Sequence, residues 1–430
     1  MELLIYSNIM EKNYKQIVSE QREEIPFYNQ LGWVPREQES AININSRLTQ
    51  IITGVRRSGK STLAHRALRG TNYAYVNFDD ERLAALDADN LNQVLEALYT
   101  VYGEFSHLLL DEIQNVERWH LFVNRLLRNN IKIVLTGSNS KLLNLEMASH
   151  LTGRYSTIEL FPFSFHEYLI AKGKKWNDTC TAKEKGLLQG LYNEYIKNGG
   201  FPEVVAGESK HSYINNLFDA IVTRDVIYRH NIRHIRTFRD LSIYLAGNFA
   251  SEISFNRLKN IFGLGSENTA KNYLAYLNEA YLVACLSKFS FKKQESLRYR
   301  KIYLIDTAFS LVAENSFTPN YGRLLENVVF LHLARKATRH RLELFYYKKL
   351  FEVDFVIYSN RKVLELIQVA QSISDTKTLK RELRALLIAA VELKAEKLTI
   401  ITLSEKKELI EEGRIIQILP VTEWLLNDVM

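Results

Sequence analysis

Cysteine is scarce in this sequence of 430 residues, which contains only Cys180 and Cys285. Two cysteines so far apart are too few for a disulfide framework or a thiolate metal site, and they favour a protein of the reducing cytosol. The sequence also lacks an apolar run of the roughly 18 residues that a membrane span requires, and its first residues show no basic leader before an apolar core. The ten histidines suggest no cluster of metal ligands. We therefore expect a cytoplasmic protein without a membrane segment.

Net charge is low over the whole chain, at +7, but it is unevenly distributed. Residues 210 to 310 contain 15 lysines and arginines against 8 acidic residues, which accounts for the whole excess. A local surplus of this kind favours a polyanionic partner such as nucleic acid. Solvated helix faces that happen to be basic are the alternative explanation.

A glycine loop follows a short β-branched run at residues 49–63, TQIITGVRRSGKSTL. It matches the pattern G-x-x-x-x-G-K-[ST], whose backbone N–H groups surround the phosphates of a nucleotide. In this pattern Lys60 reaches the β and γ oxygens, and the Ser61 hydroxyl binds Mg²⁺. A plain glycine turn before a helix is the alternative. The expected ligands are ATP and Mg²⁺, with candidate contacts at Gly54, Arg57, Ser58, Gly59, Lys60, Ser61 and Thr62.

Two acids end the apolar run HLLLDEIQ at residues 107–114. A buried parallel strand delivers such carboxylates to the edge of the sheet where nucleotides bind. We expect Asp111 to hold Mg²⁺ through water and Glu112 to orient or polarise the attacking water, with Lys60 as the third member of the catalytic set.

Two further positions are candidates for catalysis. A polar residue after the strand at 131–136 can sense the γ-phosphate or the lytic water, and Ser138 is the candidate. The alternative is that Ser138 or Asn139 caps the N-terminus of a helix. Arg154, in the segment LTGRY, can touch the γ-phosphate of a neighbouring subunit or form a structural salt bridge.

Several motifs fall in register with a known family. GVRRSGKST, NFDDERL, LLLDEIQNVERW, LTGSNSKLL, LTGRY and LFPFSFHEYL together resemble the AAA-type ATPase module of a large bacterial and archaeal family. The later segments NGGFPEVV, IVTRDVI, KIYLIDTAFS, GRLLENVVF, EVDFVI and VTEWLL resemble the C-terminal domain of unknown function that its members usually carry. The resemblance spans nearly the whole chain, and it implies a P-loop ATPase joined to a winged-helix segment and a nuclease-like fold.

Turns and element patterns predict the domain borders. The turn NGGFPE at 198–203 marks a boundary after a helical stretch at 181–197. The predicted parts are an N-terminal helical segment 1–48, the P-loop domain 49–170, a helical linker 171–205, a winged-helix domain 206–315 and a nuclease-like domain 316–430.

The middle of the chain has the element order of a winged helix-turn-helix. A helix at 254–261, a glycine turn and a second helix at 266–280 precede a strand-like segment, with Ser266 as the expected N-cap of the second helix. Asn and Lys side chains contact bases and phosphates, so DNA is the expected partner, although a winged helix can instead dock protein. The candidate contacts are Asn268, Lys271 and Asn272 on the second helix and Lys292 and Lys293 in the wing.

In the last 110 residues we expect strands at 352–358 and 362–369 and a helix near 376–393, in an order that resembles a restriction-endonuclease-like core. Active members of that fold bind Mg²⁺ through acids on the first helix and on the second and third strands, with a lysine two residues after the last acid. Glu326 and Asp354 match the first two acids, but Gln368 and Ala370 stand where the third strand should carry glutamate and lysine. The amide lacks a charge that the metal needs, and the alanine leaves no ammonium at the site. A degenerate site without nuclease activity is therefore expected.

The predicted fold class is α/β, with a P-loop AAA-type ATPase domain followed by a helical/winged-helix domain and a degenerate nuclease-like domain. The expected function is ATP hydrolysis in association with DNA, coupled to the C-terminal module. The alternative is a nucleotide-dependent switch or scaffold that docks a protein partner with slow turnover. The sequence leaves open whether the protein forms a homo-oligomer.

Overall fold

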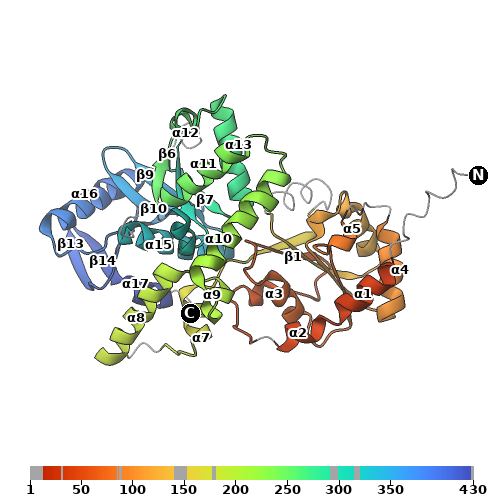
Figure 1. Cartoon of the computed structure of the whole chain (residues 1–430). Coiled ribbons are helices and arrows are strands. Elements are labelled where there is room, and N and C mark those ends of the chain that lie inside the picture. Colours follow the sequence, from red (N-terminus) through yellow and green to blue (C-terminus); the bar gives the residue numbers. More distant parts are fainter. Residues whose placement is uncertain are drawn as a thin grey trace, which may run out of the picture. The chain divides into compact units, whose positions relative to one another are not determined.

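The structure is a computed structural model, and it describes residues 13–30, 32–84, 86, 90–139, 153–176, 181–290, 299–313 and 320–427. The chain forms two compact units, Met1–Gly54 with Gly59–Leu160 and Val55–Ser58 with Phe161–Met430. Figure 1 labels helices and strands of both units where there is room. No helix within the described ranges is long and apolar enough to cross a membrane.

A five-stranded parallel sheet forms the centre of the first unit, in the order β2-β3-β4-β1-β5. All its strands point the same way, so their carboxyl ends share one edge, where nucleotides bind in folds of this type. The strands are β1 (Thr49–Thr53), β2 (Tyr73–Asn77), β3 (His107–Asp111), β4 (Lys132–Gly137) and β5 (Tyr155–Glu159). The helices are α1 (Tyr14–Arg22), α2 (Ile25–Gln30), α3 (Lys60–Ala67), α4 (Leu91–Tyr102) and α5 (Trp119–Arg128), with short 3-10 turns at Glu39–Ala41, Glu81–Leu83 and Ile113–Asn115.

The core of this unit explains why its strands are continuously apolar. Leu108, Leu109 and Leu110 of β3 are all buried, although successive side chains of a strand point to opposite faces. Leu108 and Leu110 pack in one apolar cluster and Leu109 in another, so both faces of β3 are covered. Coverage of both faces is the usual condition of a parallel sheet.

The second unit contains a nine-stranded mixed sheet in the order β13-β14-β12-β11-β10-β9-β7-β8-β6. Its strands are β6 (Ser251–Ile253), β7 (Val283–Lys288), β8 (Arg300–Leu304), β9 (Glu343–Lys348), β10 (Glu352–Ser359), β11 (Lys362–Val369), β12 (Lys397–Thr402), β13 (Lys407–Glu411) and β14 (Arg414–Pro420). The strands of the predicted winged-helix and nuclease-like domains thus belong to one sheet, joined where β7 runs parallel to β9.

Helices of this unit precede the first strand of the sheet, lie between later strands and follow the last one. They are α7 (Phe165–Ala171), α8 (Ala182–Asn198), α9 (Pro202–Ala206), α10 (Lys210–Ala220), the π-helix η4 (Ile221–Tyr228), α11 (Ile235–Gly247), α12 (Phe255–Phe262), α13 (Glu267–Glu279), the 3-10 segment η5 (Thr307–Ala313), α15 (Tyr321–His340), α16 (Thr376–Leu393) and α17 (Val421–Asn427). Helices α15 and α16 lie on opposite faces. Phe330 of α15 stacks with Phe355, whereas the α16 side chains share a cluster with the next residue along β10, Val356.

The turn NGGFPE lies inside the second unit rather than between two units. Gly199 has φ +75° and lies so close to Asp306 that a Cβ atom would be 1.7 Å from the Asp306 Oδ1 atom. The Gly200 N–H donates to Asp306 Oδ2 at 2.8 Å, and the Ala308 N–H donates to Oδ1 at 2.9 Å. The buried carboxyl of Asp306 therefore joins the segments NGGFPE and LIDTAFS by hydrogen bonds. Position 199 requires glycine, because a side chain there would collide with Asp306.

Candidate functional site

The glycine loop begins where β1 ends, and α3 begins at its last residues. Gly54 passes close to the chain after β5, because a Cβ atom there would lie 2.0 Å from the Leu160 carbonyl oxygen. Gly59 adopts the left-handed conformation at φ +92° and directly precedes Lys60, the first residue of α3. Both glycines of the motif thus meet a backbone requirement that a side chain would disturb.

Ser61 and Asp111 meet at the carboxyl edge of the sheet. The Ser61 hydroxyl donates to Asp111 Oδ1 at 3.0 Å, and the Thr136 hydroxyl donates to the same oxygen. Burial and the neighbouring charge of Glu112 raise the pKa of Asp111 to about 6, although these two hydrogen bonds and Lys60 act to lower it. A hydroxyl next to a buried carboxylate is a donor set that suits a hard divalent cation, and such a cation would relieve the cost of burying the charge. The residues present therefore fit Mg²⁺.

Glu112 is held through both its backbone N–H and its carboxylate. It adopts φ +52°, and its backbone N–H donates to the Thr136 hydroxyl at 3.0 Å. One carboxylate oxygen lies 3.7 Å from the Lys60 ammonium, and the other accepts hydrogen bonds from the Ser138 N–H at 3.3 Å and the Gln114 amide. Lys60 is buried, so this ion pair is shielded from solvent. The side chains named for phosphate binding and for water activation therefore touch one another.

The remaining residues of the glycine loop differ in exposure. The Ser58 side chain is buried and Thr62 is half-buried, whereas Arg57 is exposed and lies 3.7 Å from Glu203. Of the polar residues after β4, Ser138 and Asn139 are both buried. The Ser138 hydroxyl has no hydrogen-bond partner among the described residues, and the helix that either residue would cap lies outside them.

Arg154 lies at the amino ends of the strands, opposite the edge of the sheet that carries the glycine loop. Its carbonyl accepts the N–H of Thr49, and Tyr155 stands beside Thr49 at the amino ends of β5 and β1. The glycine loop follows the carboxyl end of β1, so the exposed Arg154 side chain is separated from it by the length of the strand. A catalytic contact from Arg154 would have to reach the nucleotide of another subunit.

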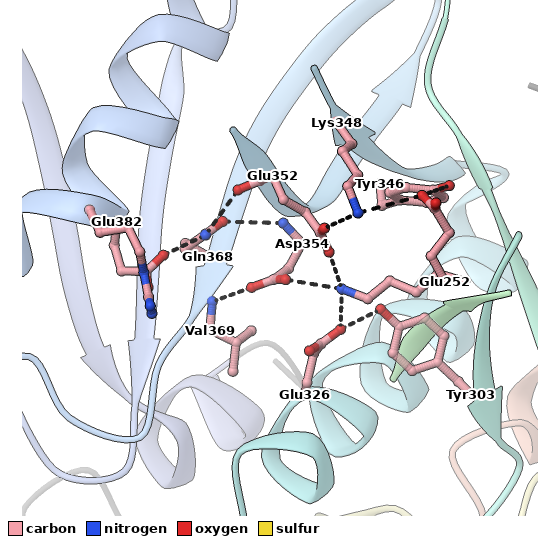
Figure 2. A network of polar contacts seen from close by, with 12 residues as sticks. Glu252, Tyr303, Glu326, Tyr346, Lys348, Glu352, Asp354, Gln368, Val369 and Glu382 are labelled. Carbon is pink, nitrogen blue, oxygen red and sulfur yellow. Dashed lines mark hydrogen bonds and ion pairs between the residues drawn. The ribbon is translucent and has the colours of Figure 1, made fainter. Parts of the chain in front are cut away.

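A second group of functional candidates surrounds a lysine that sequence reasoning did not select. The Lys301 ammonium, on β8, lies 2.7 Å from Glu326, 2.9 Å from Glu352 and 3.2 Å from Asp354. Figure 2 shows the three carboxylates pointing toward one another from α15 and β10. The expectation that no ammonium occupies this centre is therefore wrong, because a different strand supplies it.

Burial shapes the ionisation of this carboxylate centre, defined as Lys301, Glu326, Glu352 and Asp354. Burial and the charge of Asp354 raise the pKa of Glu326 to about 7, and burial also raises the pKa of Asp354. Burial by itself lowers the pKa of Lys301, but the surrounding acidic groups outweigh it and raise this pKa well above its ordinary value. The lysine thus remains charged.

Gln368 lies next to this centre and contacts the backbone of β10. Its Oε1 accepts the Asp354 N–H at 3.2 Å, and its amide nitrogen donates to the Glu352 carbonyl at 3.1 Å and to Glu382 on α16. The amide thus supports the strand that carries two of the acids. No set of three histidine, cysteine or acidic side chains in the described part of the chain is arranged to hold a metal ion.

The nucleic-acid candidates are partly described. Asn268, Lys271 and Asn272 are exposed on α13, and Lys271 and Asn272 follow Asn268 by three and four residues, so both lie on its face of the helix. Ser266 caps this helix as expected, since its hydroxyl accepts the Thr269 N–H at 3.1 Å. The other two candidates, Lys292 and Lys293, lie outside the described residues.

Comparison with known proteins assigns most of the chain to three families. Residues 46–169 match an AAA domain, residues 189–319 match a domain of unknown function (DUF8612), and residues 321–424 match another (DUF4143). The uncharacterized protein MJ1544 of Methanocaldococcus jannaschii is 36% identical over 395 residues, which cover 88% of each chain. This chain belongs to the same family of AAA-domain proteins.

Other relatives of this AAA-domain protein are similarly uncharacterized. A Haemophilus influenzae protein is 31% identical over 343 residues, which cover 76% of this chain and 83% of the relative. Among solved structures, the Walker-type ATPase of Pyrococcus abyssi is 14% identical, covering 65% of this chain and 96% of its own, with a TM-score of 0.39. AMPPCP-bound DnaA from Aquifex aeolicus is also 14% identical, covering 56% and 86%, with a TM-score of 0.29. The predicted α/β architecture with an AAA-type P-loop domain is confirmed.

Two residues at the candidate sites of this AAA-domain protein, Thr136 and Lys301, were not predicted from the sequence. Thr136 joins Asp111 to Glu112, and its position two residues before Ser138 at the end of an apolar strand was a usable signal. Lys301 was harder to find, because it belongs to a strand far from the acids in sequence. A lysine next to the apolar run Ile302–Ile305 was the only local indication.

Proposed function

We propose that this AAA-domain protein hydrolyses ATP at the glycine loop and couples its nucleotide state to the C-terminal unit in association with DNA. The observation that carries the proposal is the meeting of Lys60, Ser61, Asp111 and Glu112 at one edge of the parallel sheet. Phosphoryl transfer requires positioning and charge neutralisation, and these residues offer both.

The roles follow from the contacts of each side chain. The loop N–H groups and Lys60 would bind the β and γ oxygens of ATP, which compete with Glu112 for the ammonium. Once released from Lys60, the Glu112 carboxylate would accept a hydrogen bond from the attacking water and align it with the γ-phosphorus. Ser138, whose N–H already contacts Glu112, would keep the carboxylate in place. Bound Mg²⁺ would neutralise charge on the phosphates, held by Ser61 and by Asp111 through water.

Coupling is supported by a contact of the glycine loop within the second unit. Val55–Ser58 belong to the second unit, where Arg56 donates two hydrogen bonds to the buried carboxylate of Asp225, at 3.2 and 3.3 Å. The pair joins the loop to the π-helix η4. A change in the loop on nucleotide binding would therefore be transmitted to η4.

DNA association is supported by charge and by element order. The sequence α11, β6, α12, α13, β7, β8, with β8 antiparallel to both β6 and β7, matches the order of a winged helix. The exposed face of α13 carries Asn268, Lys271 and Asn272, whose side chains suit bases and phosphates. We infer that this face contacts DNA.

A switch or scaffold that docks protein is the second candidate. It is favoured by the internal use of some of the basic residues, since Arg239 pairs with Asp219 and Lys301 is buried among acids. A nucleotide-dependent switch would bind ATP through the same loop but turn it over slowly. A cytoplasmic location stays a prediction from the low cysteine content.

The test is steady-state ATPase turnover of the full chain with Mg²⁺, with and without duplex or single-stranded DNA. We expect Lys60→Ala to weaken nucleotide binding, and Glu112→Gln to keep binding while lowering turnover by roughly 100-fold or more. DNA should bind and stimulate the wild type at moderate salt. No turnover by the wild type under any condition would overturn the hydrolysis proposal, and failure of DNA to bind or stimulate would favour the protein-docking switch.

A further inference from the structure

The carboxylate centre matches the hydrogen-bonding capacity of a single ammonium group. A lysine side chain has three N–H donors and no acceptor. Lys301 Nζ contacts three carboxylates, those of Glu326 at 2.7 Å, Glu352 at 2.9 Å and Asp354 at 3.2 Å. The ammonium is therefore fully used, and the lysine side chain is only 4% exposed.

Each acid is also held from a second side. The Tyr303 hydroxyl donates to Glu326 at 2.7 Å, and the Val369 N–H donates to Asp354 Oδ2 at 2.9 Å. Lys348 lies 3.1 Å from Glu352. These contacts, drawn in Figure 2, orient the carboxylates around the position of the lysine nitrogen. The centre has the construction of a cation site, including outer partners that fix its ligands.

The distances suit an ammonium rather than a metal ion. Charge-assisted N–H···O bonds are about 2.7–2.9 Å long, whereas Mg²⁺ and Ca²⁺ lie roughly 2.0–2.6 Å from their oxygen ligands. Two of the three contacts of Lys301 fall in the first range and the third is slightly longer. The carboxylates are thus spaced for the larger separation.

We infer that the Lys301 ammonium is the built-in cation of this centre and that it joins β8, α15 and β10 without a divalent metal ion. The join lies where the strand pairing of the sheet is shortest. Strands β7 and β9 connect its two parts through a short pairing, Ser287 with Phe345 and Lys288 with Tyr346. Lys301 extends from β8 to acids on β10 and α15, so it bridges the same junction electrostatically.

Metal binding by matched variants tests this assignment. Nucleotide-free full-length protein, treated with EDTA and dialysed, is melted over a titration of Mn²⁺ or Mg²⁺. Any shift of the wild-type Tm with the metal should come from Ser61 and Asp111, and it should therefore be the same in Asp354→Asn. Lys301→Ala leaves Glu326 and Asp354 without their cation, so we expect its Tm to fall by roughly 5–10 °C. Mn²⁺ or Mg²⁺ should restore little of this loss, because the acids are spaced for N–H···O contacts. Lys348→Ala is the control, because Lys348 touches the same Glu352 but is 42% exposed. It should show little loss and no metal-dependent recovery.

A second measurement keeps the inference testable if Lys301→Ala does not fold. Mn²⁺ binding to the wild type is compared with binding to Asp354→Asn, and we expect no difference between them. Mn²⁺ binding that is lost in Asp354→Asn, or metal-dependent DNA cleavage by the wild type that is lost in Asp354→Ala, would overturn the assignment. A Lys301→Ala variant that melts at the wild-type Tm would overturn it as well.

Discussion

Buried carboxyl groups in this protein are stabilised by different partners. Asp111 accepts hydroxyl hydrogen bonds, the acids around Lys301 share an ammonium, and Asp306 accepts two backbone N–H groups. Neither kind of partner fully offsets the cost of burying a carboxylate. Burial raises the pKa of Asp111 and of Asp306 to about 6, and it raises the pKa of Glu326 to about 7. At the scale of single residues, these groups make stability depend on pH near neutrality.

The Asp306→Asn variant tests this dependence. The folded pKa of Asp306 lies above its ordinary value of 3.8, so the stability it contributes is full at low pH and is lost as pH rises through about 6. Asparagine does not ionise, but it has one carbonyl oxygen for two N–H donors and should be less stable at low pH. We expect the difference in free energy of unfolding between wild type and variant to narrow by on the order of 3 kcal/mol as pH rises from about 4 to 7. Urea titrations measure it, and a constant or widening difference would contradict the explanation.

Helix α13 has one face buried in the unit and one face exposed to solvent. Its buried residues, including Leu274 and Leu277, pack into the unit, while Asn268, Lys271 and Asn272 face outward. Ser266 fixes where the helix starts by capping the Thr269 N–H. The cap places the polar residues in the first two turns, where a recognition helix contacts base edges.

Substituting Lys271 tests the outward face of this element. If Lys271 contacts a DNA phosphate, Lys271→Ala should weaken duplex binding on all sequences and reduce the slope of log K against log salt by about 1. Fluorescence anisotropy over a salt series measures both. Lys380→Ala, which removes an exposed lysine from α16, is the matched control and should leave the slope unchanged. Equal slopes for all three proteins would remove Lys271 from the DNA surface.

Assembly decides what Arg154 can do at the scale of the whole molecule. Its place at the amino ends of β1 and β5 keeps it from the glycine loop of its own chain. Only a homo-oligomer could bring this guanidinium to a γ-phosphate, where it would neutralise developing charge. Catalysis by Arg154 therefore requires a homo-oligomer.

Mixing two inactive variants tests that link. We expect Arg154→Ala and Lys60→Ala each to have low ATPase turnover. When mixed, some subunits would combine an intact glycine loop with an intact Arg154 from a neighbour, and turnover should recover to a fraction of the wild-type rate. No recovery, together with full activity of Arg154→Ala alone, would leave Arg154 with a structural role.

Local patterns predicted most elements of the fold. The apolar run at 107–111 became β3, the helix expected at 376–393 became α16, and the strands expected at 352–358 and 362–369 became β10 and β11. These predictions rest on side-chain periodicity, which depends on near neighbours in sequence. The border expected between 206–315 and 316–430 could not be judged in this way, because the pairing of β7 with β9 joins segments more than 50 residues apart.

By itself the sequence determined the glycine loop, the acids after β3 and the order of helices and strands, because each depends on residue types at short, regular spacings. It also placed Glu326, Asp354 and Gln368 on neighbouring elements. Only the tertiary structure decided which cation these acids surround. Lys301 precedes Asp354 by 53 residues, and no spacing rule relates a lysine on one strand to acids on another strand and a helix. Their meeting follows from the packing of β8, α15 and β10, where the partly buried carboxylates require a positive charge and β8 provides it.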